Sequence, residues 1–371
     1  MEFTVSKADL VRELGLSQGV VEKKTTIPIL SNVLLEARGD RLIITATDLE
    51  LGICSSCPAQ VKREGAGTIP AKRLLDYVRL LPDSDVTIKF LDNQWANLTC
   101  GRSRTRIAGI SRESFPELPS MPEATGELPV SLFSSMITKT IFAISAEESR
   151  FTLNGALLLL RPDGMTMVST DGHRLAYVET TAPINGIGHP FRALIPRKAM
   201  SEIVKLSAEC GADSKVAVAG DENHLFFRFN TRLLITRRLT GNFPDYDRVL
   251  PKDSQHTVVL RTAEIKSAID RVAQFADERS GAIRVNFGPG DVKVFSSSSD
   301  TGESEESVST DYDGPNIEIG FNAHYLLDFL RVVSEETVKF ELKDQKNAGE
   351  MRPGGEGTTY LYRYVVMPMR I

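Results

Sequence analysis

Two cysteines, Cys54 and Cys57, have the CxxC spacing that redox and zinc sites use. A redox pair requires its first cysteine at a helix N-terminus, where the helix dipole lowers the thiol pKa. Here the pair follows a strand-like run at residues 42–47, and no helical pattern comes after it. A zinc site needs two more ligands, but Cys100 and Cys210 have no matching neighbours. The pattern therefore predicts structural thiols, with no metal and no cofactor.

A second candidate for chemistry is the segment Asp171-Gly172-His173-Arg174, in which His173 would be a general base oriented by Asp171. Residues so close in sequence rarely reach that geometry, and no nucleophile motif accompanies them. The sequence also contains no P-loop, no HExxH motif and no glycine-rich dinucleotide fingerprint. These observations favour a protein that is not an enzyme.

Composition is that of an ordinary globular protein, with 41% hydrophobic and 25% charged residues in a chain of 371. The formal net charge is −5, so binding to a polyanion would need positive charge concentrated locally. The longest aliphatic run, 156–160, is far below the roughly 18 residues of a membrane span. The N-terminus is polar and charged, unlike a signal peptide. We therefore expect a cytoplasmic protein that does not bind membranes.

The chain repeats itself three times, because a helical pattern around Leu74 recurs around Met200 and Leu326 at equal steps. The apolar, acidic and basic positions all recur in register, and an alternating strand follows each block. A second helical pattern precedes each of these blocks. Together they predict six helices, at residues 6–18, 71–80, 131–146, 197–207, 261–275 and 322–334.

This order of elements predicts an α+β fold of three repeated domains, each with two helices packed on antiparallel sheets. Proline-rich stretches at 115–129 and 243–251 mark the boundaries. The predicted domains are 1–122, 128–251 and 256–371.

Positive charge is concentrated in the expected helices, which hold thirteen basic and seven acidic residues and so leave −11 for the rest of the chain. Basic helical faces on an acidic protein can hold a polyanion on one surface and repel it elsewhere. The alternative, that these are merely the solvated faces of amphipathic helices, stays open.

A second asymmetry of charge lies between the two ends of the chain. Arg102, Arg104 and Arg106 alternate in a strand-like stretch of the first third, whereas the last third is acidic at the matching type of position. Edges of opposite charge favour head-to-tail self-association, which closes into a ring if the geometry permits. The acidic residues are Asp300, Glu303, Glu305 and Glu306, and the alternative is that they form only an exposed loop.

Three motifs in this order make the chain similar to the bacterial sliding clamp, the beta subunit of the replicative DNA polymerase, over essentially its full length. They are Thr170-Asp171-Gly172-His173-Arg174-Leu175-Ala176, Phe243-Pro244-Asp245-Tyr246 with Arg248-Val249-Leu250-Pro251, and Tyr364-Val365-Val366-Met367-Pro368-Met369-Arg370. The resemblance implies a head-to-tail homodimer that forms a ring of six domains, with helices lining the hole. Such a ring encircles duplex DNA, slides without sequence specificity and serves as a processivity factor.

The resemblance also implies sites. Its DNA-lining residues would be Lys24, Arg73, Arg150, Arg197 and Lys198, although Phe151-Thr152 stands where relatives often have paired tyrosines. Its dimer interface would include Phe275 beside the charged edges. The polymerase catalytic subunit, clamp-loader subunits, other polymerases and repair proteins would dock short peptides between the second and third domains. The walls of that cleft would be Leu153, Thr170, Gly172, His173, Arg174, Leu175, Pro244, Arg248, Val249, Asn322, Tyr325, Val365, Val366, Met367, Pro368 and Met369.

Two alternatives and one unassigned segment remain beside this interpretation. Val365 to Met369 could be only a final strand packed in the core. The chain could be a repeat scaffold that binds proteins and no DNA, which its negative charge would suit. Residues 343–359, rich in glycine, are expected to form a long loop near the cleft, with no role assigned.

Overall fold

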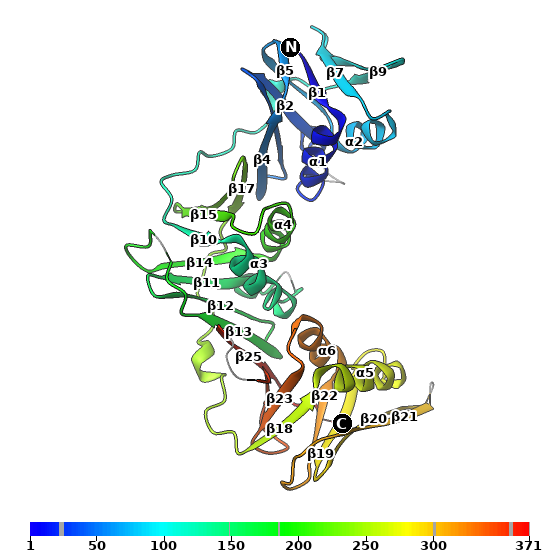
Figure 1. Cartoon of the computed structure of the whole chain (residues 1–371), viewed down its shortest axis with the longest axis vertical. Coiled ribbons are helices and arrows are strands. Elements are labelled where there is room, and N and C mark those ends of the chain that lie inside the picture. The colour runs from blue at the N-terminus through cyan, green and yellow to red at the C-terminus, as the bar shows by residue number, and fades with distance from the viewer. Residues whose placement is uncertain (22–25, 148, 185, 300–301, 356–358, 371) are drawn as a thin grey trace. The chain divides into compact units, whose positions relative to one another are not determined.

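The computed structural model describes residues 1–371 except 22–25, 148, 185, 300–301, 356–358 and 371 (Figure 1). Lys24 and Asp300 therefore lie outside the described residues. The chain forms two compact units. The first unit comprises Met1–Ser134 and Lys198–Arg238, and the second comprises Ser135–Arg197 and Leu239–Ile371. No helix in the described part of the chain is long and apolar enough to cross a membrane.

The first unit contains an eight-stranded and a five-stranded sheet, both antiparallel. In order, the larger sheet is β10 (Gly126–Pro129), β15 (Lys215–Gly220), β16 (His224–Phe229), β17 (Arg232–Arg237), β4 (Leu51–Pro58), β3 (Arg41–Thr47), β2 (Asn32–Arg38) and β6 (Gly65–Pro70). The smaller is β5 (Gln60–Arg63), β1 (Glu2–Ser6), β7 (Asp85–Phe90), β8 (Trp95–Cys100) and β9 (Ser103–Ala108). Helices α1 (Lys7–Ser17) and α2 (Ala71–Leu80) lie side by side in this unit (Figure 1).

The second unit repeats this plan with an eight-stranded and a four-stranded sheet. The larger is β14 (Phe191–Pro196), β11 (Gly155–Arg161), β12 (Gly164–Thr170), β13 (Arg174–Thr180), β25 (Tyr360–Val366), β24 (Gly349–Pro353), β23 (Thr337–Leu342) and β18 (His256–Arg261). The smaller is β21 (Gly302–Ser309), β20 (Asp291–Ser298), β19 (Ala282–Gly288) and β22 (Ile317–Asn322). Helices α5 (Thr262–Val272) and α6 (Ala323–Val332) pack side by side here (Figure 1).

Each large sheet combines strands from two of the three repeats. In the first unit β17 pairs with β4, with Ile235 opposite Gly52; this pairing is called the first joint. In the second unit β13 pairs with β25, with Leu175 opposite Val365; this is the second joint. Strands from neighbouring repeats thus complete one hydrogen-bonded sheet, so neither leaves an open edge at the joint.

The helices form where the sequence predicts them. In α2, Leu74, Leu75 and Val78 are buried while Lys72 and Arg73 are exposed, as amphipathic spacing requires. The other two helices, α3 (Val130–Thr138) and α4 (Arg197–Ala208), also lie within predicted ranges or one residue beyond them.

The predicted helix at 131–146 is too long. Helix α3 ends at Thr138, and only a 3₁₀ turn at Ile141–Ala143 follows. The hydroxyl of Thr140 donates to the carbonyls of Met136 (2.9 Å) and Ile137 (3.2 Å), which competes with further helical bonding.

The expected loop at 343–359 is partly wrong, and so is the alternative that the acidic residues form only a loop. Residues 349–353 form β24, an inner strand between β23 and β25, because Glu350 and Met351 are buried and the glycines only flank them. Glu303, Glu305 and Glu306 lie in the edge strand β21, so they are not merely an exposed loop.

Candidate functional site

A tight turn joins β12 to β13 and fixes the segment Thr170–Arg174. The hydroxyl of Thr170 donates to the carbonyl of Arg174 (2.6 Å) and accepts the N–H of Gly172 (3.1 Å). Oδ1 of Asp171 accepts the N–H groups of His173 (2.9 Å) and Arg174 (3.1 Å), and Oδ2 accepts Nε of Arg174 (3.0 Å). Gly172 has φ +89°, a conformation that favours glycine. Asp171 thus holds the backbone turn and does not orient the imidazole, which removes the basis for acid–base chemistry.

Arg174 is the buried centre of this site, with only 9% of its surface exposed. Nη1 donates to Asp328 of α6 (2.7 Å), Nη2 donates to the carbonyl of Phe142 (2.6 Å), and the guanidinium lies 4.3 Å from the ring centre of Tyr325. Burial lowers the pKa of Arg174, but Tyr364 and the carboxylates outweigh that effect and hold the pKa above its ordinary value. The charge is therefore permanent, and it ties β13 to α6.

The second joint brings several of the predicted cleft residues together. Leu175, Val249 and Val365 belong to one apolar cluster with Phe243 and Leu250. The N–H of Met367 donates to the carbonyl of His173 (2.9 Å), so the end of the last strand lies beside the turn. Asn322 caps α6 by accepting the N–H of His324 (2.9 Å). The hydroxyl of Tyr364 donates to the carbonyl of Tyr325 (2.8 Å).

Exposure divides the predicted cleft residues into a floor and a rim. Thr170, Arg174, Leu175, Val365 and Val366 are buried. The core-strand alternative therefore holds for Val365 and Val366, whereas Met367 is 36% exposed. The half-buried members are Leu153, Val249, Asn322, Tyr325, Pro368 and Met369, and the exposed ones are Gly172, His173, Pro244, Arg248 and Met367.

The sequence missed Asp328 and Phe142, which hold the Arg174 guanidinium. Asp328 recurs with Asp76 and Glu202 in the repeat, which suggests a solvated helix face. Its partner is 154 positions away, so no local spacing reveals the pair. The one signal available in the sequence was that Asp328 lies on the same helix as Tyr325, a predicted cleft residue.

The predicted DNA-lining residues are placed at exposed or half-exposed positions. In the first unit Arg73 is exposed on α2, and Lys198 is exposed but forms an ion pair with Asp48. In the second unit Arg197 is exposed at the start of α4. Arg150 donates to the carbonyl of Asp171 (2.9 Å) and pairs with Glu147 (2.8 Å). Phe151 is 71% exposed.

One helical cation counted toward a basic surface is not on the surface. Lys139 follows α3, is 9% exposed and donates to the hydroxyl of Ser135 (2.8 Å). Burial lowers its pKa. Lys139 belongs to the packing of the second unit and cannot contribute to an exposed polyanion-binding face.

The charged stretches expected to self-associate lie on edge strands. Arg104 and Arg106 are exposed on β9, and Arg102 is exposed in the turn before it. On β21, Glu303 and Glu305 are exposed, while Glu306 forms a two-point ion pair with Arg271 of α5 (both 2.7 Å). Phe275 is half-buried in the 3₁₀ turn Ala273–Phe275. Glu306 is thus already engaged within its own chain.

The cysteines carry no reactive site. Cys54 and Cys57 both lie within β4, a strand that packs against α1, and neither cysteine begins a helix. Burial raises the pKa of Cys57 to about 12 and also raises that of Cys54, so both are protonated at neutral pH. Among the residues that the structure describes, no His, Cys, Asp and Glu side chains gather as a metal would require.

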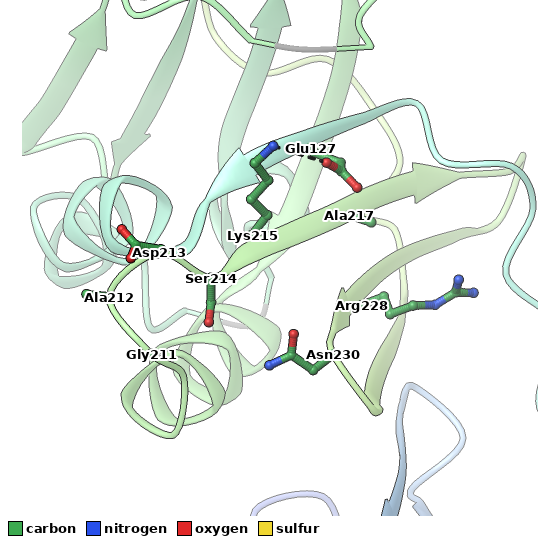
Figure 2. Close-up of a pocket in the computed structure, with 9 residues that line it drawn as sticks. All are labelled: Glu127, Gly211, Ala212, Asp213, Ser214, Lys215, Ala217, Arg228 and Asn230. Carbon is green, nitrogen blue, oxygen red and sulfur yellow. Dashed lines mark ion pairs between the residues drawn. The ribbon is translucent and has the colours of Figure 1, made fainter.

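A surface pocket of about 670 Å³ lies apart from every predicted site residue (Figure 2). Lys215 and Glu127 form an ion pair at its rim (3.6 Å), and Asp213 and Arg228 add one charge of each sign. Its charges therefore balance, and it singles out no ligand.

Three family models match the chain in sequence. They describe the N-terminal, central and C-terminal domains of the DNA polymerase III beta subunit, and they match residues 1–119, 127–245 and 247–370. A beta sliding clamp from Pseudomonas putida is 34% identical over 374 residues, covering all of both chains.

Solved structures give the same picture. A beta sliding clamp from C. crescentus, with PEG bound to a putative beta-motif tethering region, is 34% identical with a TM-score of 0.93, covering 100% of this chain and 99% of its own. A sliding clamp from Pseudomonas aeruginosa bound to griselimycin is 32% identical with a TM-score of 0.92, covering all of both chains.

Proposed function

The chain belongs to the DNA polymerase III beta subunit family, and from that membership we propose that it is the processivity factor of a bacterial replicative DNA polymerase. The observation that carries this is the match of three beta-subunit domains, in order, along one chain. The role is non-catalytic: the protein binds DNA and the polymerase and holds them together.

In finer detail, we propose that two copies close head-to-tail into a ring. Arg104 and Arg106 on the edge strand β9 would meet Glu303 and Glu305 on the edge strand β21 of the partner copy. Edge strands offer unpaired backbone groups and the opposite charges set the register, so both features support this pairing. Glu306 is assigned a supporting role through Arg271.

Arg73, Arg197 and Lys198 are proposed to contact DNA phosphates, which carry no sequence information and so permit sliding. Lys24 stays in this proposal on resemblance alone. Arg150 is the least available of the set, because the Asp171 carbonyl and Glu147 already use its guanidinium.

The partner cleft is proposed at the second joint, where His173, Met367 and the Arg174 turn adjoin an apolar cluster. Methionine is flexible and polarizable, which suits a surface that receives varied peptides. The docking partners would be the polymerase catalytic subunit, clamp-loader subunits, other polymerases and repair proteins. Griselimycin is a practical probe, because a relative's structure contains it.

Retention on DNA tests this function. The protein is loaded by its cognate loader onto nicked circular duplex, washed in high salt and compared before and after the circle is linearised. Loss only on linearisation is the expected result, because a ring is held by topology and not by salt-sensitive phosphate contacts. Equal retention on both forms would mean ordinary binding. No retention with an active loader would favour a scaffold that binds only proteins.

A further inference from the structure

The first joint has a groove of its own, with a volume of about 910 Å³. Its floor comes from the strands on both sides of the joint and includes Leu34, Thr45, Cys54, Leu233 and Ile235. The linker Phe115–Ser120 forms a wall. The groove lies wholly within the first unit and shares no residue with the proposed partner cleft.

This groove stands in the same structural setting as the partner cleft. The turn before β4 repeats the hydrogen bonds of the turn before β13: the hydroxyl of Thr47 donates to the carbonyl of Leu51 (2.9 Å), and Oδ1 of Asp48 accepts the N–H groups of Glu50 (2.9 Å) and Leu51 (2.7 Å). A Phe-Pro linker borders each joint, Phe115-Pro116 here and Phe243-Pro244 there. The fold therefore builds the same turn and the same kind of linker beside both joints.

The charges of the two settings differ. Residues 113–127 contain four glutamates and no lysine or arginine, whereas the linker 243–257 at the second joint contains three aspartates together with Arg248 and Lys252. Glu113 and Glu117 line the groove, are exposed and make no ion pair with any residue that the structure describes. A third carboxylate, Glu36, is already paired with Arg38 (3.1 Å) and Arg112 (3.5 Å). Two carboxylates beside an apolar floor thus remain available to a ligand.

We propose that this groove is a second docking site, which binds a short segment of a partner protein that carries apolar side chains next to lysine or arginine. The apolar side chains would lie over Leu118 and Leu233, which are half-buried, and the cations would pair with Glu113 and Glu117. Apolar area supplies most of the affinity, and charge complementarity selects basic over acidic segments.

Fluorescence anisotropy with the full chain tests this. The probe is a short fluorescein-labelled peptide in which leucine alternates with lysine, and its counterpart replaces lysine with glutamate. The groove variant Glu113→Lys/Glu117→Lys is compared with Glu123→Lys/Glu222→Lys, which changes the net charge equally at exposed positions outside the groove. We expect the groove variant to weaken binding of the lysine peptide about tenfold at low salt, and the control to change it less than about twofold.

Leu233→Ala tests the apolar contact. Its weaker binding of the lysine peptide should persist in high salt, because salt screens charges and not apolar contacts. Unchanged thermal unfolding and unchanged griselimycin binding show that each variant is folded and that the partner cleft is intact. The proposal is overturned if the lysine peptide does not bind, if the glutamate peptide binds equally, or if both charge variants weaken binding alike. A groove variant that alters self-association in sedimentation, without peptide binding, would assign the groove to a second copy and also overturn it.

Discussion

The first joint, where β17 pairs with β4, and the second joint, where β13 pairs with β25, share a backbone plan and differ in side chains. Both begin at a Thr-Asp turn with the same hydrogen bonds. After the turn, however, the first joint has Leu51 and Gly52, and the second has Arg174 and Leu175. The backbone thus supplies continuity of the sheet, while side chains decide what the surface beside it can bind.

The residues at the ends of β17 and β25, the second strand of each joint, complete the contrast. The first joint ends in Thr236 and Arg237, and the second ends in Val366 and Met367 at the corresponding register. Arg237 pairs with Glu50 at 3.2 Å, whereas Met367 bonds through its backbone and leaves its side chain partly exposed. In the described residues the corresponding rim position is thus apolar and partly exposed at the second joint and charged at the first, which supports the partner cleft proposed at the second joint.

Each joint also holds a buried ion pair. At the first, Glu13 of α1 accepts two hydrogen bonds from Arg232 of β17 (2.7 and 3.0 Å). At the second, Arg174 binds Asp328 of α6. In both cases the pair fastens a helix to the strand that crosses between repeats.

The largest expected effect is at the second joint. Arg174→Ala removes the buried guanidinium that Asp328 and Asp171 share, and breaking a buried pair in this way costs about 3–5 kcal/mol. Hydrogen exchange of β13 and α6 measures the loss locally. Arg248→Ala removes an exposed pair with Asp245 and should cost under about 1 kcal/mol. An equal loss of unfolding free energy in the two variants would contradict the role of Arg174 in tying β13 to α6.

At the first joint, Glu13→Gln should cost about 3 kcal/mol, because it removes the charge facing a nearly buried Arg232. Denaturant unfolding measures the loss of free energy, and hydrogen exchange of the α1 amides shows whether that helix is loosened. Lys72→Ala, which removes an exposed ion pair with Asp76 on α2, is the control and should change little. A Glu13→Gln chain as stable as the wild type would show that the pair does not fasten α1.

The same pair predicts a pH dependence. Burial raises the pKa of Glu13, but the hydrogen bonds from Arg232 and Arg12 outweigh it, so the pKa lies below its ordinary value of 4.5. A depressed pKa gives stability that is present above 4.5 and is lost as the pH falls through the folded-state value. We expect Glu13→Gln to flatten the acid limb of the unfolding free energy of the first unit. An unaltered acid limb would contradict this.

Griselimycin binding should depend on the second joint and not on the first. Met367→Ala is expected to weaken griselimycin binding about tenfold, or roughly 1.4 kcal/mol, through lost apolar contact. Arg237→Ala, at the corresponding position of the first joint, should leave it unchanged. Calorimetry on both variants measures the difference, and a larger loss in Arg237→Ala would reverse the assignment.

The smallest effects concern the two turns. Gly172→Ala forces a side chain into a positive φ and places its Cβ 3.0 Å from Nη1 of Arg150, which should cost about 1 kcal/mol. Leu49 occupies the equivalent position at φ +78°, so Leu49→Gly should relieve strain and change stability by less than about 1 kcal/mol. Melting temperatures check both; a stabilised Gly172→Ala would disprove the shared constraint.

Local patterns in the sequence were sufficient for the elements but not for the joints. Residues 71–80 predicted α2 to the residue, because apolar spacing is a local property. The pairing of Leu175 with Val365, and of Arg174 with Asp328, depends on a strand and a helix of one repeat meeting a strand of another. The glycines around residues 349–353 suggested a loop, yet tertiary pairing on both sides made β24 a strand. Family resemblance supplied the cleft residues; it did not supply Asp328.

The most direct test of the contrast between the joints is hydrogen–deuterium exchange of the full chain with and without griselimycin. We expect slower exchange at residues 172–176 and 363–369 of the second joint. We expect no change at residues 49–54 and 233–238 of the first. Protection at the first joint, with none at the second, would contradict the assignment of partner docking to the second joint.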